Sequence, residues 1–495
     1  MNEALDKARA FEEQYGPFIP AEQRPAFHLT PTIGWMNDPN GFSRYQGEYH
    51  LFYQYYPYST EWGPMHWGHA KTRDFLRWER LPAALAPDQP YDRNGCFSGS
   101  AVELPNGKHL IVYTGVCKHL AEDGRTVETQ TQCLALGDGV NYQKYSKNPV
   151  LTQADLPEGG SPVDFRDPKI WQEPDGSFRL VVGNRPADNS GAVLLYESPD
   201  GMDWHLVGQV DASHGQYGMM WECPDFFLLD GKQVLLVSPQ EMSPVGLEFH
   251  AGNGTVCIIG SYDKAENRFV REHIQAVDYG IDFYAPQTLE AEDGRRIMIG
   301  WMQNWNTVAG KPRDCRWFGQ MALPRELSIE NGRLIQKPVR ELEQYRRNPV
   351  SYQDVVLNNQ EINLHNVSGR MIDMTLNIRP MGEAVYDCFR VSLARDGEFV
   401  TTIRYKPDTS ILKIDRTRSG SNADIVHTRS LLVRPQGGVL QLRLILDRYS
   451  VEAFVNDGEQ AASVAIFTRQ EAAAISFEAS GSLILDVTKY DIVMD

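Results

Sequence analysis

The sequence lacks paired cysteines, an excess of positive charge and any long apolar run. Its seven cysteines are odd in number, scattered and without a Cys-x-x-Cys pair, which argues against a disulfide framework or a zinc site. A formal net charge of −17 argues against nucleic acids and membrane surfaces as partners, because these attract excess lysine and arginine. No apolar run reaches the ~18 residues of a membrane helix, and the N-terminus has no apolar signal core. We therefore expect a cytoplasmic protein without metal or other cofactor, present as a monomer or homodimer.

The length of 495 residues exceeds one ordinary core and predicts two domains. At the N-terminus, apolar residues recur at helical spacing, which predicts a short amphipathic helix over residues 3–15 that Gly16-Pro17 ends. From about residue 25 onward, short apolar runs broken by Gly, Pro, Asn and Asp indicate β structure.

Five turn signals recur roughly 60 residues apart, each followed at once by an apolar run typical of a strand. They are Gln46-Gly47, Asn106-Gly107, Asp175-Gly176, Asp230-Gly231 and Asp293-Gly294. Asn-Gly and Asp-Gly between apolar runs predict hairpins, because type I′ turns need positive φ at both central residues. The repeated unit then resembles the blade of a closed propeller. The other interpretation is an irregular all-β stack whose turns match by coincidence.

The strand that enters each predicted hairpin carries an informative position nine residues before the glycine. The residues there are Asp38, Ser98, Asp167, Glu222 and Ala285. Equivalent positions in a closed propeller surround one axis, so three carboxylates from distant segments would converge. Converging acids repel one another, and because this cost has no structural purpose, the convergence predicts an active site.

A second recurring feature adds two strands to each unit. After the hairpin comes another apolar run, then a turn and an aromatic residue, at Trp78, Tyr142, Trp204 and Phe269. The repeat stops near residues 327–338, and beyond the charged stretch 341–347 short alternating runs predict a β-sandwich. The expected domains are a helix and lead-in over residues 1–24, a propeller over 25–338 and a sandwich over 346–495.

Each acidic segment has a purely structural explanation when it is taken alone. Asp38-Pro39-Asn40-Gly41 is a turn sequence, Arg166-Asp167-Pro168 suits a structural ion pair before a bend, and Glu222 suits an exposed strand. Their shared position in the repeat weakens all three explanations.

In that order along the chain, the segments WMNDPNG (35–41), FRDP (165–168) and WECPD (221–225) resemble the signature blocks of the β-fructofuranosidases, glycoside hydrolase family 32. The similarity extends over about residues 25–495. Further matching segments are Tyr53-Gln54 with Trp62, residues 97–101, 282–287, 300–302 and 323–327, and DRYSVEAFVNDGE at 447–459. The resemblance implies a five-bladed β-propeller with a C-terminal β-sandwich, in agreement with the all-β pattern above.

The resemblance also implies residue roles. Asp38 would be the nucleophile, Glu222 the general acid/base and Asp167 the stabiliser of the transition state, in a retaining double displacement. A glutamate beside two other carboxylates is expected to hold its proton near neutral pH. The residues expected to bind the fructosyl group are Trp35, Met36, Asn37, Gln54, Trp62, Phe97, Ser98, Arg166, Asp282 and Trp305.

Two functional alternatives remain at this point. The same fructosyl intermediate serves a fructosyltransferase, and a propeller that only binds sugars is the interpretation from another class. The expected reaction is release of terminal β-D-fructofuranosyl groups from sucrose, sucrose 6-phosphate or short fructo-oligosaccharides. A phosphate site would need cations at the rim of the pocket, for which the loop candidates are Lys118, His119, Lys311, Arg313 and Arg316.

Overall fold

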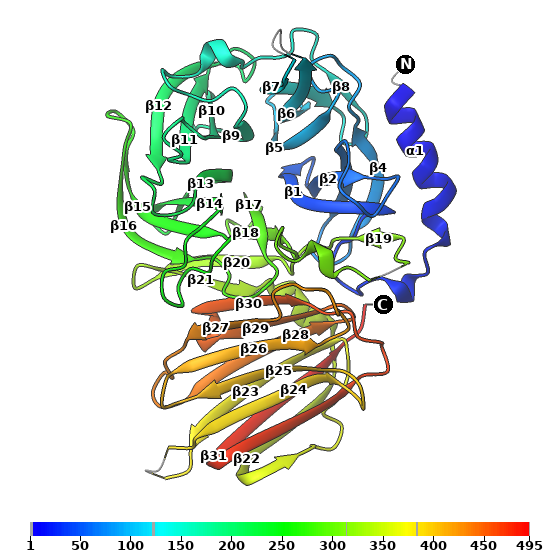
Figure 1. Ribbon diagram of the computed structural model, residues 1–495, viewed down its shortest axis with the longest axis vertical. Coiled ribbons are helices and arrows are strands. Elements are labelled where there is room, and N and C mark those ends of the chain that lie inside the picture. Colours follow the sequence, from blue (N-terminus) through cyan, green and yellow to red (C-terminus); the bar gives the residue numbers. More distant parts are fainter. Residues whose placement is uncertain (1–2, 121–123, 313, 383–384, 495) are drawn as a thin grey trace.

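Five four-stranded sheets surround one axis in the upper part of the computed structural model, which describes residues 3–120, 124–312, 314–382 and 385–494 (Figure 1). Each sheet is an antiparallel meander whose first strand lies nearest the axis. The first two blades are β1 (Gly34–Tyr45), β2 (Glu48–Tyr56), β3 (His66–Thr72), β4 (Glu79–Leu85), and β5 (Gly95–Glu103), β6 (His109–Leu120), β7 (Thr126–Gly137), β8 (Tyr142–Lys144). The five-bladed propeller is thereby confirmed.

The remaining blades follow the same order. The third is β9 (Phe165–Gln172), β10 (Phe178–Asn184), β11 (Ala192–Ser198), β12 (His205–Ala212), and the fourth is β13 (Met220–Leu229), β14 (Lys232–Gln240), β15 (Val256–Asp263), β16 (Arg268–Ala276). The fifth is β17 (Tyr284–Glu290), β18 (Arg296–Trp301), β20 (Arg325–Glu330), β21 (Arg333–Pro338). The short β19 (Trp317–Phe318), which comes from a connection in blade 5, pairs in parallel with β1 and so ties the last blade to the first.

The five turn signals all join the first and second strands of their blades, as predicted. Their conformation differs from the prediction in three cases. Gln46-Gly47 and Asp230-Gly231 have positive φ at both residues, as a type I′ turn requires. In the other three turns only the glycine has positive φ, and its N–H donates to the carbonyl three residues earlier. These turns are longer, so sequence spacing counted from the glycine is not the same in every blade.

The predicted N-terminal helix is α1 (Glu3–Tyr15), which lies along β4 at the outer edge of blade 1 (Figure 1). An outer strand has unpaired backbone groups that invite association with another chain. Here Arg9 Nε donates to the Ala83 carbonyl at 2.9 Å, and Glu12 Oε2 accepts from the Ala83 N–H at 3.0 Å. The helix therefore satisfies part of an exposed sheet edge. No helix among the described residues is long and apolar enough to cross a membrane.

The C-terminal part forms the predicted sandwich from one continuous set of strands. The long β31 (Ala474–Ile492) pairs with β24 through its first half and with β23 through its second half, so two sheets share it. The strands are β22 (Arg346–Ile362), β23 (Ile372–Pro380), β24 (Cys388–Arg395), β25 (Val400–Lys406), β26 (Ile411–Arg418), β27 (Thr428–Leu432), β28 (Leu440–Asp447), β29 (Ser450–Val455), β30 (Gln460–Ala465) and β31. Short 3-10 turns lie at 16–18, 21–23, 153–155, 308–310, 340–345 and 456–458.

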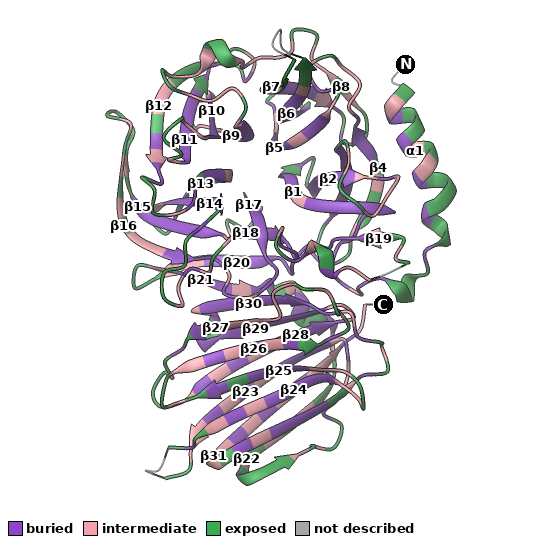
Figure 2. Ribbon diagram, in the orientation of Figure 1, coloured by how far each residue is buried: buried purple, intermediate pink, exposed green. Residues whose placement is uncertain are grey.

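The sandwich packs directly beneath blades 4 and 5 through the edge strand β30 (Figure 2). Backbone N–H groups of Tyr279 and Ile281, in the connection before β17, donate to carbonyls of Ala461 and Ser463 at 2.8 and 2.9 Å. One apolar core cluster extends from blades 3 and 4 into the sandwich. This continuous core and the paired backbone hold the two domains as one body.

Candidate active site

The first strand of every blade loses register with the second strand at the same depth. The shifts fall in Met36–Pro39, Phe97–Gly99, Arg166–Lys169, Glu222–Asp225 and Tyr284–Gln287. A bulge of this kind bends the strand and turns side chains away from their regular direction. Positive φ at Asp167, Cys223 and Ala285, each followed by proline, marks three of the bends. The repeat thus supplies five bent strands whose side chains meet at the propeller axis.

Asp38, Asp167 and Glu222 line one cavity of about 310 Å³ at this point, which we call the axial pocket. Asp38 and Asp167 lie within their register shifts, whereas Glu222 is the last paired residue before its shift. The turn between β13 and β14 has only two residues, so counting back nine residues from Gly231 reaches farther along the strand. The turn of blade 1 is equally short, but a second register shift between Asn40 and Ser43 adds one residue to β1 and compensates. The other lining residues are Asn37, Gln54, Trp62, Phe97, Ser98, Glu128, Gln130, Asp164, Arg166, Gln240 and Trp305.

Asp38 is held by two neutral donors. Asn37 Nδ2 donates to Oδ1 at 3.1 Å, and the Ser98 hydroxyl donates to Oδ2 at 2.8 Å. Burial, followed by the nearby charge of Glu222, raises the pKa of Asp38 to about 6. At neutral pH this carboxylate is largely ionised and fixed in orientation, as a nucleophile has to be.

Asp167 is 5% exposed and accepts the backbone N–H of Cys223 at 3.0 Å. Burial and the charge of Glu222 raise its pKa to about 7, although Arg166 opposes the shift. The thiol of Cys223 lies 3.6 Å from Asp167 Oδ2 and 3.7 Å from Asp38 Oδ2, so it touches both aspartates. The two acids share one crowded environment, and their titration is coupled.

Arg166 is the cation of the cluster. Its Nε and Nη2 both donate to Glu222 Oε1 at 3.0 Å, and its Nη1 donates to Asp164 at 2.5 Å. Nη1 also contacts Gln130 Oε1 at 3.4 Å. The guanidinium therefore fixes Glu222 in place and is itself fixed by Asp164 and Gln130, outside the three axial carboxylates.

Tyr284 holds the other oxygen of Glu222. Its hydroxyl lies 2.6 Å from Glu222 Oε2 and 3.0 Å from the carbonyl oxygen of Ser238. A carbonyl only accepts hydrogen bonds, so a hydroxyl that donates to Ser238 can accept from a protonated Oε2. When Glu222 is ionised, the same hydroxyl can turn and donate to it. This residue suits both protonation states of a general acid/base.

Most of the binding residues expected from the sequence line the axial pocket. Trp62 is 46% exposed at its mouth and packs edge-on against Phe97, with ring centroids 6.0 Å apart. Trp35 and Met36 lie behind the pocket instead. Trp35 donates to Asn37 Oδ1 at 2.7 Å and stacks on Trp305, so it supports two lining residues without lining the pocket.

Asp282 differs most from its expected position. It is fully buried at the domain junction, where it pairs with Arg416 of the sandwich at 2.5 Å and accepts from Thr307 Oγ1 at 2.8 Å. The matching segment 282–287 runs from this junction to the axis, so its residues serve two places. Tyr284, two positions later, is the one that reaches the site.

Sequence reasoning missed Glu128, Gln130, Asp164, Gln240 and Tyr284. Two of these had a signal in the sequence. Asp164 directly precedes the recognised FRDP segment, and Gln240 ends the apolar strand that follows a recognised hairpin turn. Glu128 and Gln130 lie on β7, the third strand of blade 2, with no turn or motif to mark them. Only the closed arrangement of the blades brings them to the pocket.

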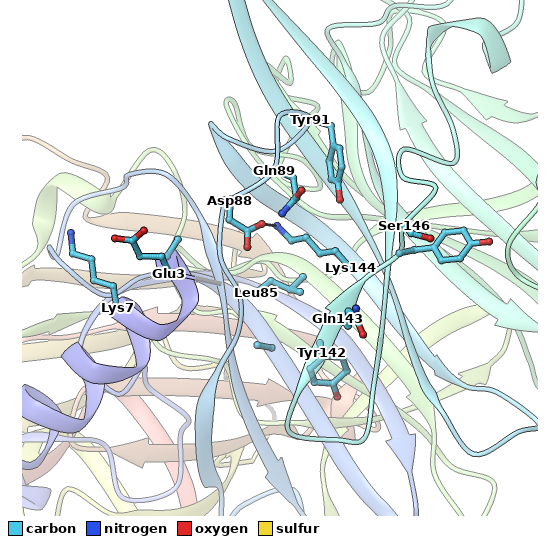
Figure 3. Close-up of a pocket in the computed structure, with 13 residues that line it drawn as sticks. Glu3, Lys7, Leu85, Asp88, Gln89, Tyr91, Tyr142, Gln143, Lys144 and Ser146 are labelled. Atoms are coloured by element: carbon cyan, nitrogen blue, oxygen red, sulfur yellow. Dashed lines mark hydrogen bonds and ion pairs between the residues drawn. The ribbon is translucent and has the colours of Figure 1, made fainter. Parts of the chain in front are cut away.

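A larger cavity than the axial pocket, about 890 Å³, lies elsewhere, between α1 and the outer strands of blades 1 and 2 (Figure 3). Its lysine Lys144 is neutralised by two acids: Nζ lies 2.5 Å from Asp88, as the dashed line in the figure marks, and 2.5 Å from Asp92. Volume alone therefore does not identify the site; the uncompensated carboxylates do.

Comparison with known proteins agrees with this geometry. Models of the glycosyl hydrolases family 32 N-terminal and C-terminal domains match residues 28–338 and 341–492. The chain is 39% identical over 466 residues to raffinose invertase of Escherichia coli, covering 93% of each chain. It is 38% identical over 479 residues to sucrose-6-phosphate hydrolase of Zymomonas mobilis, covering 94% of this chain and 90% of that one.

Among solved structures, the chain is similar to the β-fructofuranosidase BmSUC1 of Bombyx mori. The TM-score is 0.84 at 33% identity, with 99% of each chain covered. A mutant of that silkworm enzyme has been solved in complex with sucrose, and it aligns with this chain at a TM-score of 0.83.

Proposed function

The chain belongs to glycoside hydrolase family 32, and on that premise we propose how its three axial carboxylates divide the chemistry. The activity is that of a β-fructofuranosidase, a retaining glycosidase that acts on a carbohydrate substrate. The observation that carries the assignment of roles is the convergence of Asp38, Asp167 and Glu222 on one axial pocket, where Arg166 is the one arginine among the described lining residues.

Asp38 is proposed as the nucleophile. In the first step its carboxylate attacks the anomeric carbon of the fructosyl group, and the bond to the leaving oxygen breaks. The hydrogen bonds from Asn37 and Ser98 fix its orientation, and at pH above 6 most of the group is ionised. A covalent fructosyl ester results, which a second displacement by water resolves with net retention.

Glu222 is proposed as the general acid and base. It delivers a proton to the departing oxygen, then takes a proton from the attacking water. Its Oε2 contacts Tyr284 and its Oε1 contacts Arg166, so both oxygens of the carboxyl group are held in place. In this role Glu222 transfers protons and forms no bond to the sugar. Asp167 is proposed to stabilise the positive charge that develops on the ring, aided by a fixed position at the bend of β9.

The proposed substrates have a terminal fructofuranosyl group: sucrose, its phosphate or short fructo-oligosaccharides. Transfer to a sugar uses the same intermediate and remains the second candidate, which product analysis at high sucrose distinguishes. We propose the cytoplasm as the place of action. All seven cysteines are unpaired in the structure, which favours a reducing compartment.

Chemical rescue tests the assignment of roles. Glu222→Ala with a fructoside that has a good leaving group should form the ester but not hydrolyse it, because the base is missing. Added azide should then release a β-configured fructosyl azide, since the second displacement restores the first configuration. An α-configured product, or rescue of Asp38→Ala to the same β-product, would contradict the assignment.

A further inference from the structure

The mouth of the axial pocket carries an excess of negative charge. We propose that this enzyme selects fructosides whose leaving group is uncharged, of the sucrose type, and discriminates against leaving sugars that bear a phosphate. This inference rests on the proposed function and specifies the substrate class of the same site.

The charges that line the pocket are strongly unbalanced. Its carboxylates are Asp38, Glu128, Asp164, Asp167 and Glu222, and Arg166 is the one cation among the described lining residues. That guanidinium already donates to Glu222, Asp164 and Gln130. Little of its donor capacity remains for a phosphate, which prefers a bidentate arginine.

The excess lies where the leaving group must lie. Ser98 and Asp167, 3% and 5% exposed, mark the deep end, where the Ser98 hydroxyl donates to Asp38. The fructosyl group occupies that end, and the rest of the substrate points outward. Glu128, Asp164 and Gln240 are only partly buried and line the outward part together with the exposed Trp62. A phosphate on the leaving sugar would therefore face Glu128 and Asp164.

The cations expected from the sequence to hold a phosphate are already engaged. Lys118 lies opposite Glu128 across β6 and β7 and pairs with it at 3.3 Å. Lys311 pairs with Glu61 and with the carbonyl of Thr60. A further cation, Arg185, was not expected from the sequence: its backbone N–H donates to the Asp164 carbonyl at 3.2 Å, and its side chain pairs with Glu241 at 3.5 Å.

Two other candidates add no counter-charge to the lining. His119 and Arg316 are not among the described lining residues, and Arg313 lies outside the described residues. A dianion at the mouth would compete with these carboxylates for their partners and would repel them as well. A neutral sugar meets neither obstacle, and Trp62 and Trp305 offer it aromatic surface.

The first experiment compares kcat/KM for sucrose and for sucrose 6-phosphate with the unmodified enzyme at low salt. We expect sucrose to be favoured by about tenfold or more, with the ratio narrowing as salt screens the repulsion. If the enzyme hydrolyses sucrose 6-phosphate as efficiently as sucrose, or more efficiently, this inference is overturned and the proposed function stays intact. Loss of turnover on both sugars would instead overturn the proposed function, and this inference with it.

A second experiment assigns the effect to the mouth. Glu128→Gln removes one carboxylate and frees Lys118, so the preference for sucrose should shrink by about threefold to tenfold, mainly through the KM of the phosphate. Glu79→Gln is the matched control, because Glu79 also pairs with a lysine, Lys71, directly across two antiparallel strands, but on the outside of blade 1. A ratio that is unchanged in Glu128→Gln, or that changes equally in Glu79→Gln, counts against the proposal.

Discussion

Two clusters of buried acids, one at the propeller axis and one at the domain junction, are built from the same residue types and behave in opposite ways. At the axis, Arg166 donates to Glu222 alone among Asp38, Asp167 and Glu222. At the junction, Asp447 and Glu452 both contact His28, and Arg325 contacts Glu452 as well. Their neighbour Asp278 contacts Arg325 but not His28, and burial still raises its pKa. Comparing the two clusters separates the effect of burial on the pKa of a carboxylate from the effect of its cationic partners.

The junction gives its acids cations on both sides. His28 contacts Asp447 through Nδ1 at 2.8 Å and Glu452 through Nε2 at 2.9 Å, so both ring nitrogens donate when the ring is charged. The two carboxylates raise the pKa of His28 to about 9 against the effect of burial. Hydrogen bonds and charge from His28 in turn hold the pKa values of Asp447 and Glu452 below their usual range, although burial opposes this shift.

The axis leaves its acids short of cations, and the pKa values of Asp38 and Asp167 rise to about 6 and 7. Both clusters are desolvated, so the number and placement of cations decide the direction. Unrelieved repulsion destabilises the folded protein, and at the axis it is retained because the chemistry needs acids that exchange protons near neutral pH. We infer that the acids paired with His28 stabilise the fold, whereas the axial acids are retained for their chemistry.

The sharpest way to break the comparison is Asp38→Asn. We expect kcat/KM to fall by about 10⁴-fold or more, because the nucleophile is lost. Removing one repelling charge should stabilise the fold at pH 8 by about 1–3 kcal/mol. Activity assays and thermal unfolding measure the two effects.

The control for that variant is Asp225→Asn, because Asp225 also comes from the first strand of a blade and is buried, but pairs with Lys169 at 3.2 Å. It should lose stability where Asp38→Asn gains it. A stabilised Asp225→Asn, or an Asp38→Asn that keeps its activity, would show that the two clusters do not differ as described.

His28→Gln attacks the other cluster. A neutral residue there removes the cation that contacts both Asp447 and Glu452 and leaves Glu452 with Arg325, which should lower the free energy of unfolding by about 3–5 kcal/mol. At a temperature where the variant is folded, kcat/KM should stay near that of the unmodified enzyme, since His28 is far from the chemistry. His205→Gln, an exposed histidine on β12, serves as control and should leave both quantities unchanged. Loss of activity without loss of stability would contradict a structural role.

Sequence reasoning reached the axial acids because a turn signal recurs in every blade and three of the five positions nine residues before its glycine carry a carboxylate. It placed Asp282 in the site because the segment 282–287 matches the family as a block. In the structure this short segment leads from the domain junction, where Asp282 lies, to the axis, which Tyr284 reaches. Glu128 and Gln130 had no local signal, since their position depends on blade 2 closing against blade 3. The partners of His28 were also hidden, because Asp447 lies more than 400 residues away. Repeats are readable from sequence; charge balance between distant segments is not.

The pH dependence should separate the clusters in one protein. Below pH 6, kcat/KM should fall as Asp38 takes up a proton, while the fold stays intact because Asp447 and Glu452 remain ionised to lower pH. The contribution of His28 to stability is fully present below its unfolded pKa, about 6.5, and is lost as pH rises through about 9. The melting temperature of the unmodified protein should therefore fall as the pH rises from about 6.5 to about 9, and it should fall less in His28→Gln. Equal slopes in the two proteins would show that His28 is not charged in the folded state.

The smallest expected effect concerns Tyr284, which holds Glu222 but does not react. In Tyr284→Phe, loss of one hydrogen bond of about 1–1.5 kcal/mol should lower kcat on sucrose roughly tenfold with little change in KM. A fructoside whose leaving group needs no proton should form its ester at nearly the normal rate, because that step no longer depends on Glu222 as an acid. Tyr279→Phe is the matched control: its hydroxyl donates to Glu248 at 2.7 Å, also buried, but beside the junction. That control should cost stability and leave kcat unchanged. An equal loss on both fructosides in Tyr284→Phe would mean that Tyr284 supports the pocket as a whole, and the distinction between holding the acid and packing the axis would fail.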